Sequence, residues 1–173
     1  MGKARWGNPQ EPCLLYVFQY NGVYMKELCK PFVAGFLDGE AYIGLMQRRT
    51  KNSPRPYMVK PTIKVAQLEK CREVLDYLHH HYGGYISKAR EHHNTRNSIM
   101  WEVSKLDTIH QIMLDIQESV IVKKPQVEIM IQYCSLPKMT NILSEENNKI
   151  YEQKCELQNQ MAKLNKRGLA ETE

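Results

Sequence analysis

The sequence predicts an α+β domain in which helices cover one side of an antiparallel sheet. Three observations indicate this class. Period-two and helical hydrophobic patterns alternate along the chain, 42% of the 173 residues are hydrophobic, and no apolar run approaches the roughly 20 residues of a membrane span. A chain of this length is expected to form one domain with a sizeable core. The patterns follow the order helix, two strands, helix, two strands, then further helices, which suits helices packed on a sheet.

The expected elements begin with a helix at Lys30, because Pro31 suits a first helical turn, and this helix ends near Gly39. Pro61 lies inside the second expected strand and indicates an edge position or a bulge. The remaining expected elements are strands at 41–49 and 57–67, a helix at 68–82 stopped by two glycines, a hairpin with strands at 85–90 and 98–104, and helices at 106–120 and 125–136.

The chain is expected to divide into three parts. Residues 1–29 are an N-terminal arm, residues 30–137 the main domain, and residues 138–173 a C-terminal helical extension. In the extension, Ser144 is expected to cap a long polar helix that ends before Gly168. The apolar stripe of that helix is thin, so a narrow contact with the main domain is expected.

Basic charge is concentrated in the middle of the chain. From Gln47 to Lys105 there are twelve Lys and Arg against five Asp and Glu, whereas from Ser144 onward there are five against six. A polyanion such as nucleic acid is the natural partner of such a region, although a solvated basic surface explains the charge equally well.

The cysteines are odd in number and scattered, which indicates free thiols and an intracellular reducing compartment. A bacterial cytoplasm and an organelle such as a chloroplast or mitochondrion are not distinguished. The five are Cys13, Cys29, Cys71, Cys134 and Cys155.

The most informative segment joins small apolar residues to two carboxylates. Ala34 and Gly35 let another backbone come close, and Asp38 and Glu40 can hold a hard divalent cation at the end of the same helix. The run Val33–Ala41 resembles, position by position, the LAGLIDADG motif of homing endonucleases, except that its last residue is Ala instead of the usual Gly. The motif occurs once, as in the family members that work as homodimers.

This resemblance covers roughly residues 30–136 and implies an α-β-β-α-β-β-α domain with an antiparallel sheet saddle. It also implies a homodimer through the motif helix, with Val33, Ala34, Gly35 and Leu37 at the interface. The implied activity is that of a hydrolase that cuts both strands of double-stranded DNA at a long, pseudo-palindromic target. Mg2+ is the implied cofactor, which Mn2+ or Ca2+ can replace for binding, and the implied biological role is intron homing.

Phosphodiester hydrolysis needs an activated water and charge neutralisation, which divalent metals supply when carboxylates hold them. The resemblance makes Glu40 the metal ligand, with the backbone of Gly39 beside the metal. It makes Gln67 a residue that positions solvent and Lys123 a residue that stabilises phosphate charge. Asp38 is expected to end the motif helix. An ordinary acidic helix terminus is the alternative for Glu40, and a solvated loop is the alternative for Lys123.

DNA contacts are expected from the polar faces of the strands, because Arg, Lys and Gln read purine edges in the major groove. Any of them could instead bind phosphate, which positions the protein without specifying sequence. Arg48 points away from Arg49 in a regular strand and is the poorest candidate. The expected contacts are Gln47, Arg49 and Lys51 from the first strand, Lys60, Thr62 and Lys64 from the second, and Lys88 and Arg90 from the third.

Two other functions remain open. A nucleic-acid binder that does not cleave, such as an intron RNA maturase or a DNA-binding regulator, would keep the dimer and the basic sheet but would not need Glu40. A plain protein-interaction module predicts no affinity for DNA and no two-fold axis at Ala34 and Gly35.

Overall fold

The helices and strands follow the order that the hydrophobic pattern predicts. The computed structural model describes residues 17–20, 23–26, 30–51, 55–88, 97–140 and 142–166. The elements are β1 (Val17–Tyr20), β2 (Val23–Lys26), α1 (Lys30–Glu40), β3 (Tyr42–Arg49), β4 (Tyr57–Leu68), the 3-10 helix η1 (Glu69–Cys71), α2 (Arg72–Tyr82), β5 (Tyr85–Lys88), β6 (Ser98–Val103), α3 (Leu106–Ile116), α4 (Lys124–Ser135) and α5 (Glu145–Leu164).

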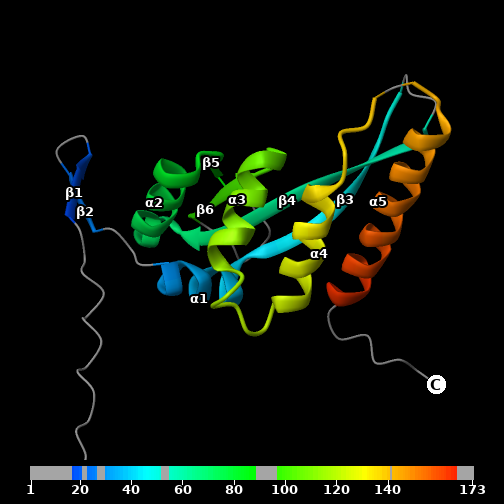
Figure 1. Ribbon diagram of the computed structural model, residues 1–173. Helices are drawn as coiled ribbons and strands as arrows, with labels where there is room; N and C mark the ends of the chain where they lie inside the picture. Colours follow the sequence, from blue (N-terminus) through cyan, green and yellow to red (C-terminus); the bar gives the residue numbers. More distant parts are fainter. Residues whose placement is uncertain are drawn as a thin grey trace, which may run out of the picture.

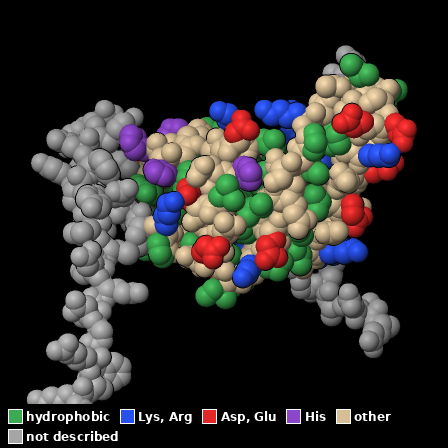
Figure 2. Space-filling view, viewed as in Figure 1, with side chains coloured by type: hydrophobic (Ala, Val, Ile, Leu, Met, Phe, Trp, Pro, Cys, Tyr) green, Lys and Arg blue, Asp and Glu red, His purple; other side chains and the backbone are tan. Residues whose placement is uncertain are grey.

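The main sheet has four antiparallel strands in the order β3-β4-β6-β5, and helices pack on one of its faces (Figure 1). The α+β class is therefore confirmed. Strands β1 and β2 form a separate two-stranded hairpin. Figure 2 shows the helix side of the molecule, over which acidic and basic side chains are interspersed. None of the described helices is long and apolar enough to cross a membrane.

Strand β4 is central, so the expectation that Pro61 marks an edge strand is wrong for the strand as a whole. Its partner β3 pairs with it from Tyr57 to Lys64, with Pro61 opposite Leu45. Its other partner, β6, pairs only from Ile63 onward. Proline cannot donate a hydrogen bond to a sheet, and it is tolerated here because this half of β4 has a strand partner on one side only.

The core lies between the helices and one face of the sheet, which carries the odd-numbered residues of β3, β4 and β6 and the even-numbered residues of β5. Ile43, Ile63 and Trp101 project from three strands into this layer and are almost completely buried. Because successive side chains of a strand point to opposite faces, the even-numbered residues of β3, β4 and β6 lie on the other face, together with Tyr85 and Ser87 of β5. None of the described helices covers this face (Figure 1). We call this second surface the open face of the sheet. The face that a strand residue occupies decides whether its side chain meets the helices or lies on the open face.

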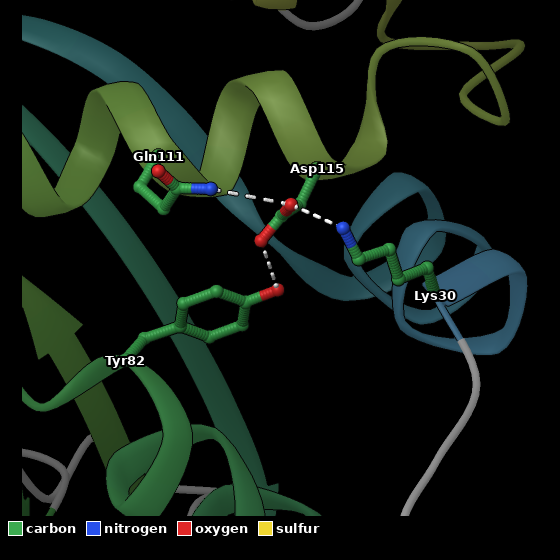
Figure 3. A network of polar contacts seen from close by, with 4 residues as sticks. All are labelled: Lys30, Tyr82, Gln111 and Asp115. Atoms are coloured by element: carbon green, nitrogen blue, oxygen red, sulfur yellow. Dashed lines mark hydrogen bonds and ion pairs between the residues drawn. The ribbon is translucent and has the colours of Figure 1, made fainter.

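A polar network joins the ends of the first three helices (Figure 3). The carboxylate of Asp115 in α3 accepts hydrogen bonds from Lys30 Nζ of α1 at 2.6 Å, from the Tyr82 hydroxyl of α2 at 3.2 Å and from Gln111 Nε2 at 3.3 Å. Burial raises the pKa of Asp115, but the Lys30 ammonium and the other donors lower it by a larger amount. The pKa of Asp115 therefore lies below its usual value. The network therefore fixes α1 relative to α2 and α3.

Helix α5 packs on β3 and α4 through a narrow buried stripe that includes Ile150 and Met161. Ser144 caps it as predicted, because its hydroxyl oxygen accepts the Asn147 N–H at 3.2 Å. At its other end Asn165 Nδ2 donates to the Ile43 carbonyl at 2.9 Å. The division of the chain at residues 29 and 137 stays a prediction.

Candidate active site and nucleic-acid interface

The carboxylate of Asp38 binds the loop between α3 and α4. It accepts the backbone N–H groups of Ile121 at 3.0 Å, Val122 at 2.9 Å and Lys123 at 2.7 Å. Burial by itself raises the pKa of Asp38, but the three amide donors and the Lys123 charge outweigh it, so the pKa lies below the usual 3.8. Asp38 therefore attaches a loop 85 positions away in sequence to the end of α1.

The side chain of Lys123 lies at the C-terminal end of α1. Its ammonium donates hydrogen bonds to the backbone carbonyls of Asp38 and Gly39. The last carbonyls of a helix carry partial negative charge and have no partners inside the helix, so a cation is favoured there. The Asp38 carboxylate binds the backbone N–H of Lys123, and the Asp38 carbonyl binds the Lys123 ammonium. Asp38 therefore positions both the backbone and the side-chain end of this lysine.

Glu40 is the last residue of α1, and its Oε2 accepts a hydrogen bond from Gln67 Nε2 at 3.4 Å. Gln67 is the penultimate residue of β4. The three residues that the sequence predicts to be catalytic, Glu40, Gln67 and Lys123, thus gather around one end of α1. Their catalytic roles remain predictions.

The donors at this end of α1 fit a hard divalent cation. They are oxygens: the Glu40 carboxylate and the helix-terminal carbonyls, which suit Mg2+ or Ca2+ better than softer metals. The Gly39 carbonyl accepts Lys123 Nζ at 3.2 Å, yet a carbonyl oxygen has a second lone pair. Within the described part of the chain, no group of three or more His, Cys, Asp or Glu residues is placed to hold a metal. One protomer therefore offers part of a cation site.

Three of the four residues predicted at the dimer interface are buried inside the protomer. Val33, Ala34 and Leu37 are 3%, 0% and 0% exposed, so they cannot contact a second copy, and that part of the prediction is wrong. The reason is helical spacing. Positions 33, 34 and 37 lie on one side of α1, which packs toward α3 and β4.

The opposite side of α1 is open to solvent and includes Gly35, the fourth predicted residue. Phe32 on this side is 52% exposed, Phe36 is half-buried, and Gly39 is exposed. A Cβ atom added at Gly35 or Gly39 would meet no other atom within 4 Å. We call the surface of Phe32, Gly35, Phe36 and Gly39 the outer face of α1. The spacing of four between the two glycines is the sequence signal that could have found it.

The open face of the sheet carries three of the predicted DNA contacts, Lys60, Thr62 and Lys64. Lys60 lies opposite Met46 of β3, and Lys64 lies opposite Tyr42. Directly opposed residues of paired strands share a face, so Tyr42 and Met46 belong to the same surface. Arg48 lies opposite Met58 on this face and also lines its central hollow. The sequence argument made Arg48 the poorest candidate because it points away from Arg49, and the structure does place these two side chains on opposite faces.

Two of the predicted contacts on the first strand lie on the helix side instead. Gln47 Nε2 donates to Gln158 Oε1 of α5 at 3.0 Å, and Arg49 shares its side of the strand. The choice of side follows from Ile43 and Leu45, which are buried under the helices. Lys51 is exposed beyond the end of β3.

Thr62 lies on the open face but is only 3% exposed, because it is packed in the sheet beside Glu102, whose Oε1 accepts its hydroxyl at 3.4 Å. Direct contact of Thr62 with DNA is therefore not supported. Lys88 is exposed and lies opposite Ile99, so its side chain is on the helix side of the sheet. Arg90 lies outside the described residues.

The comparisons with known proteins agree with this architecture. The sequence model of the LAGLIDADG endonuclease family matches residues 33–124, which is just over half of the chain. The match begins at Val33, on the buried side of α1, and ends at Lys124, the residue after Lys123. A comparison with curated protein sequences found no match.

Solved structures of homing endonucleases share the fold at low sequence identity. The crystal structure of I-CvuI with a DNA target has a TM-score of 0.67 at 13% identity, covering 82% of this chain and 84% of that chain. The archaeal intron-encoded I-Vdi141I, complexed with DNA, gives 0.64 at 17% identity, with 83% and 88% covered. I-TnaI gives 0.60 at 18% identity, with 80% and 96% covered. The chain therefore belongs to the LAGLIDADG endonuclease family.

Proposed function

We propose that this protein is a site-specific DNA endonuclease that cuts both strands of a long, pseudo-palindromic target as a homodimer, using Mg2+. The observation that carries the proposal is the meeting of Glu40, Gln67 and Lys123 at one end of α1, from segments far apart in sequence. Similar structures were determined with bound DNA, one in the presence of Mg and one in the presence of Ca. A DNA binder that does not cleave would have no need of this arrangement.

The outer face of α1 supports the homodimer. Glycine inside a helix costs about 1 kcal/mol relative to alanine, and nothing within the protomer requires the small size of Gly35 or Gly39. Two small residues four positions apart let a second helix approach closely, and Phe32 and Phe36 flank them with apolar surface. A two-fold axis along this face would bring the Glu40 carboxylates of two protomers together and complete the cation site.

Each residue of the site has a distinct task in this proposal. A bound divalent cation would supply charge neutralisation and a more acidic water. Glu40 would hold the cation, and the amide of Gln67, which already contacts Glu40, would orient the water. Lys123 would stabilise the phosphate charge from its place on the helix terminus, and Asp38 would keep it there. Free thiols at Cys71, Cys134 and Cys155 support a reducing intracellular compartment.

The test of the site is Glu40→Gln, which keeps the shape of the side chain but removes its charge. The DNA is a plasmid that carries the joined flanks of the gene interrupted by this reading frame. In Mg2+ we expect the wild-type protein to linearise the plasmid and the variant to lose cutting, while binding in Ca2+ persists. Glu128→Gln, on the exposed surface of α4, is the matched control and should cut normally. Normal cutting by Glu40→Gln would reject the metal assignment, and persistent binding without cutting by the wild type would favour a maturase or regulator.

The test of the dimer is Gly35→Leu, measured by analytical ultracentrifugation. Open space around Gly35 means that the side chain fits the protomer, so the protein should stay folded and become monomeric. Glu128→Leu places the same side chain at an exposed position of α4 and should leave the dimer intact. An unchanged sedimentation coefficient for Gly35→Leu would reject the outer face of α1 as the interface.

A further inference from the structure

The open face of the sheet has a hollow of about 400 Å3 at its centre. Its lining is mostly basic and polar, with Arg48, Lys60 and Lys64 around it. Of the described residues that the strand register assigns to this face, only Glu102 is acidic. A carboxylate on a surface that meets a polyanion weakens binding at every sequence, so its presence calls for a specific use.

Glu102 is fixed in place by three donors from the two neighbouring strands, β4 and β5. It lies on β6 opposite Lys64 of β4 and opposite Tyr85 of β5. Lys64 Nζ is 3.3 Å from Oε2, and the Thr62 hydroxyl donates to Oε1 at 3.4 Å. The Tyr85 hydroxyl donates to the same carboxylate, and this hydrogen bond is the main cause of the raised pKa of Tyr85.

The result is a cation and an anion at known separation, both facing the hollow. The side chains of Lys64 and Glu102 are 29% and 16% exposed, so both can still be reached. An ammonium has three donors, and the pair with Glu102 uses one of them. A carboxylate has about four acceptor positions, so Glu102 also keeps free capacity.

We propose that Lys64 and Glu102 act together as a specificity-determining pair that reads one G·C base pair in each half-site. Lys64 donates to O6 and N7 of guanine, and Glu102 accepts from N4 of cytosine. The proposal rests on the proposed function, because it requires DNA on the open face of the sheet.

The chemistry of the major groove supports this assignment. Guanine presents two acceptors and cytosine one donor, and lysine on guanine and glutamate on cytosine are the pairings that this pattern favours. Guanine O6 and cytosine N4 are hydrogen-bonded to each other, so they lie about 3 Å apart. That spacing matches the 3.3 Å between Lys64 Nζ and Glu102 Oε2. An A·T pair in the same place offers thymine O4 to the carboxylate, and two acceptors repel.

The experiment measures base preference, not overall affinity. Half-sites randomised one position at a time are bound to wild-type protein in Ca2+ and the bound fraction is sequenced. We expect one position at which the wild type prefers G·C over A·T by about tenfold or more, the discrimination of a good base contact. In Glu102→Gln this preference should fall severalfold at that position only, because an amide can donate to thymine O4. Lys64→Met should relax the same position, and Glu128→Gln should relax none.

The outcomes separate this inference from the proposed function. If the wild type selects no DNA sequence, both are overturned. If the wild type selects a site and Glu102→Gln keeps every preference, or loses affinity equally at all positions, only the base-reading pair is overturned. Lys64→Met gives an independent answer if Glu102→Gln does not fold. The pair is rejected if Lys64→Met relaxes only positions at which the wild type does not prefer G·C.

Discussion

Substituting Asp38 by asparagine tests whether one carboxylate attaches the loop between α3 and α4 to the end of α1. In the native protein this side chain accepts three backbone N–H groups, from Ile121, Val122 and Lys123, at 2.7–3.0 Å. Asparagine has one acceptor oxygen in place of two, and its NH2 group would face N–H donors. The variant therefore leaves at least one of these partly buried donors without its partner and removes the charge that strengthens the others.

The expected loss of stability follows from these contacts. A hydrogen bond to a charged group contributes about 1.5–3 kcal/mol, and an unsatisfied buried donor costs about 1–3 kcal/mol. The oxygen of asparagine keeps part of the interaction and water can reach these partly buried donors, so we expect a total loss of about 3 kcal/mol at most. For a chain of this length, that lowers Tm by about 6–12 °C.

The assay is urea unfolding and thermal unfolding of both proteins, followed by circular dichroism at equal protein concentration, because dimerisation makes stability depend on concentration. Asp76→Asn is the control, since its exposed pair with Arg72 contributes at most about 0.5 kcal/mol. If Asp38→Asn loses no more stability than this control, the reasoning is refuted.

The pH dependence of the same pair of proteins gives a second check. The pKa of Asp38 is lower in the folded than in the unfolded state. The unfolded chain therefore binds this proton first as the pH falls, and the stabilisation by Asp38 is fully present above the unfolded pKa, about 3.9. It disappears as the pH falls through the lower folded pKa. The stability difference between the wild type and Asp38→Asn should shrink below about pH 4, and a difference that stays constant would contradict the ionised acceptor.

Three further changes have expected outcomes. Asp115→Asn should destabilise the protein by about 1–2 kcal/mol, because the carboxylate accepts three donors, and urea unfolding measures this. Lys154→Met should be neutral or stabilising in the same assay, because removing a charge from a residue that is only 9% exposed offsets the loss of its hydrogen bond to the Pro137 carbonyl, and a loss above about 2 kcal/mol would contradict this. Arg48→Ala should weaken DNA binding and reduce its salt dependence by about one ion, whereas Arg49→Ala should change it less, and the reverse order in fluorescence anisotropy titrations would reject the assignment of the open face.

The order of the elements could be predicted from the sequence because burial leaves a periodic signature. Strand β4 illustrates this: Val59, Ile63 and Val65 alternate with polar residues, and the structure buries that face. The second half of β3 has no such signature, since Gln47, Arg48 and Arg49 are polar on both faces. The burial of Ile43 and Leu45 under the helices decides their sides by alternation, and it places Gln47 and Arg49 on the helix side and Arg48 on the open face.

Helix α1 shows the same limit for a helix that is apolar on all sides. Phe32, Val33, Phe36 and Leu37 surround it, so hydrophobicity does not say which side is inward. Packing against α3 and β4 buries Val33 and Leu37 and leaves the glycines of the outer face exposed. An interface on α1 stays a prediction, and three of the four residues predicted for it lie on the buried side of the helix.

By itself, the sequence determined the succession of helices and strands and the segment in which small residues precede Asp38 and Glu40. These features depend on residues close together in the chain, whose spacing is visible directly. Only the tertiary structure decided that Lys123 lies on the end of α1, that Gln67 reaches Glu40 and that Glu102 pairs with Lys64. Such contacts join positions dozens of residues apart, and the packing of the whole core sets them.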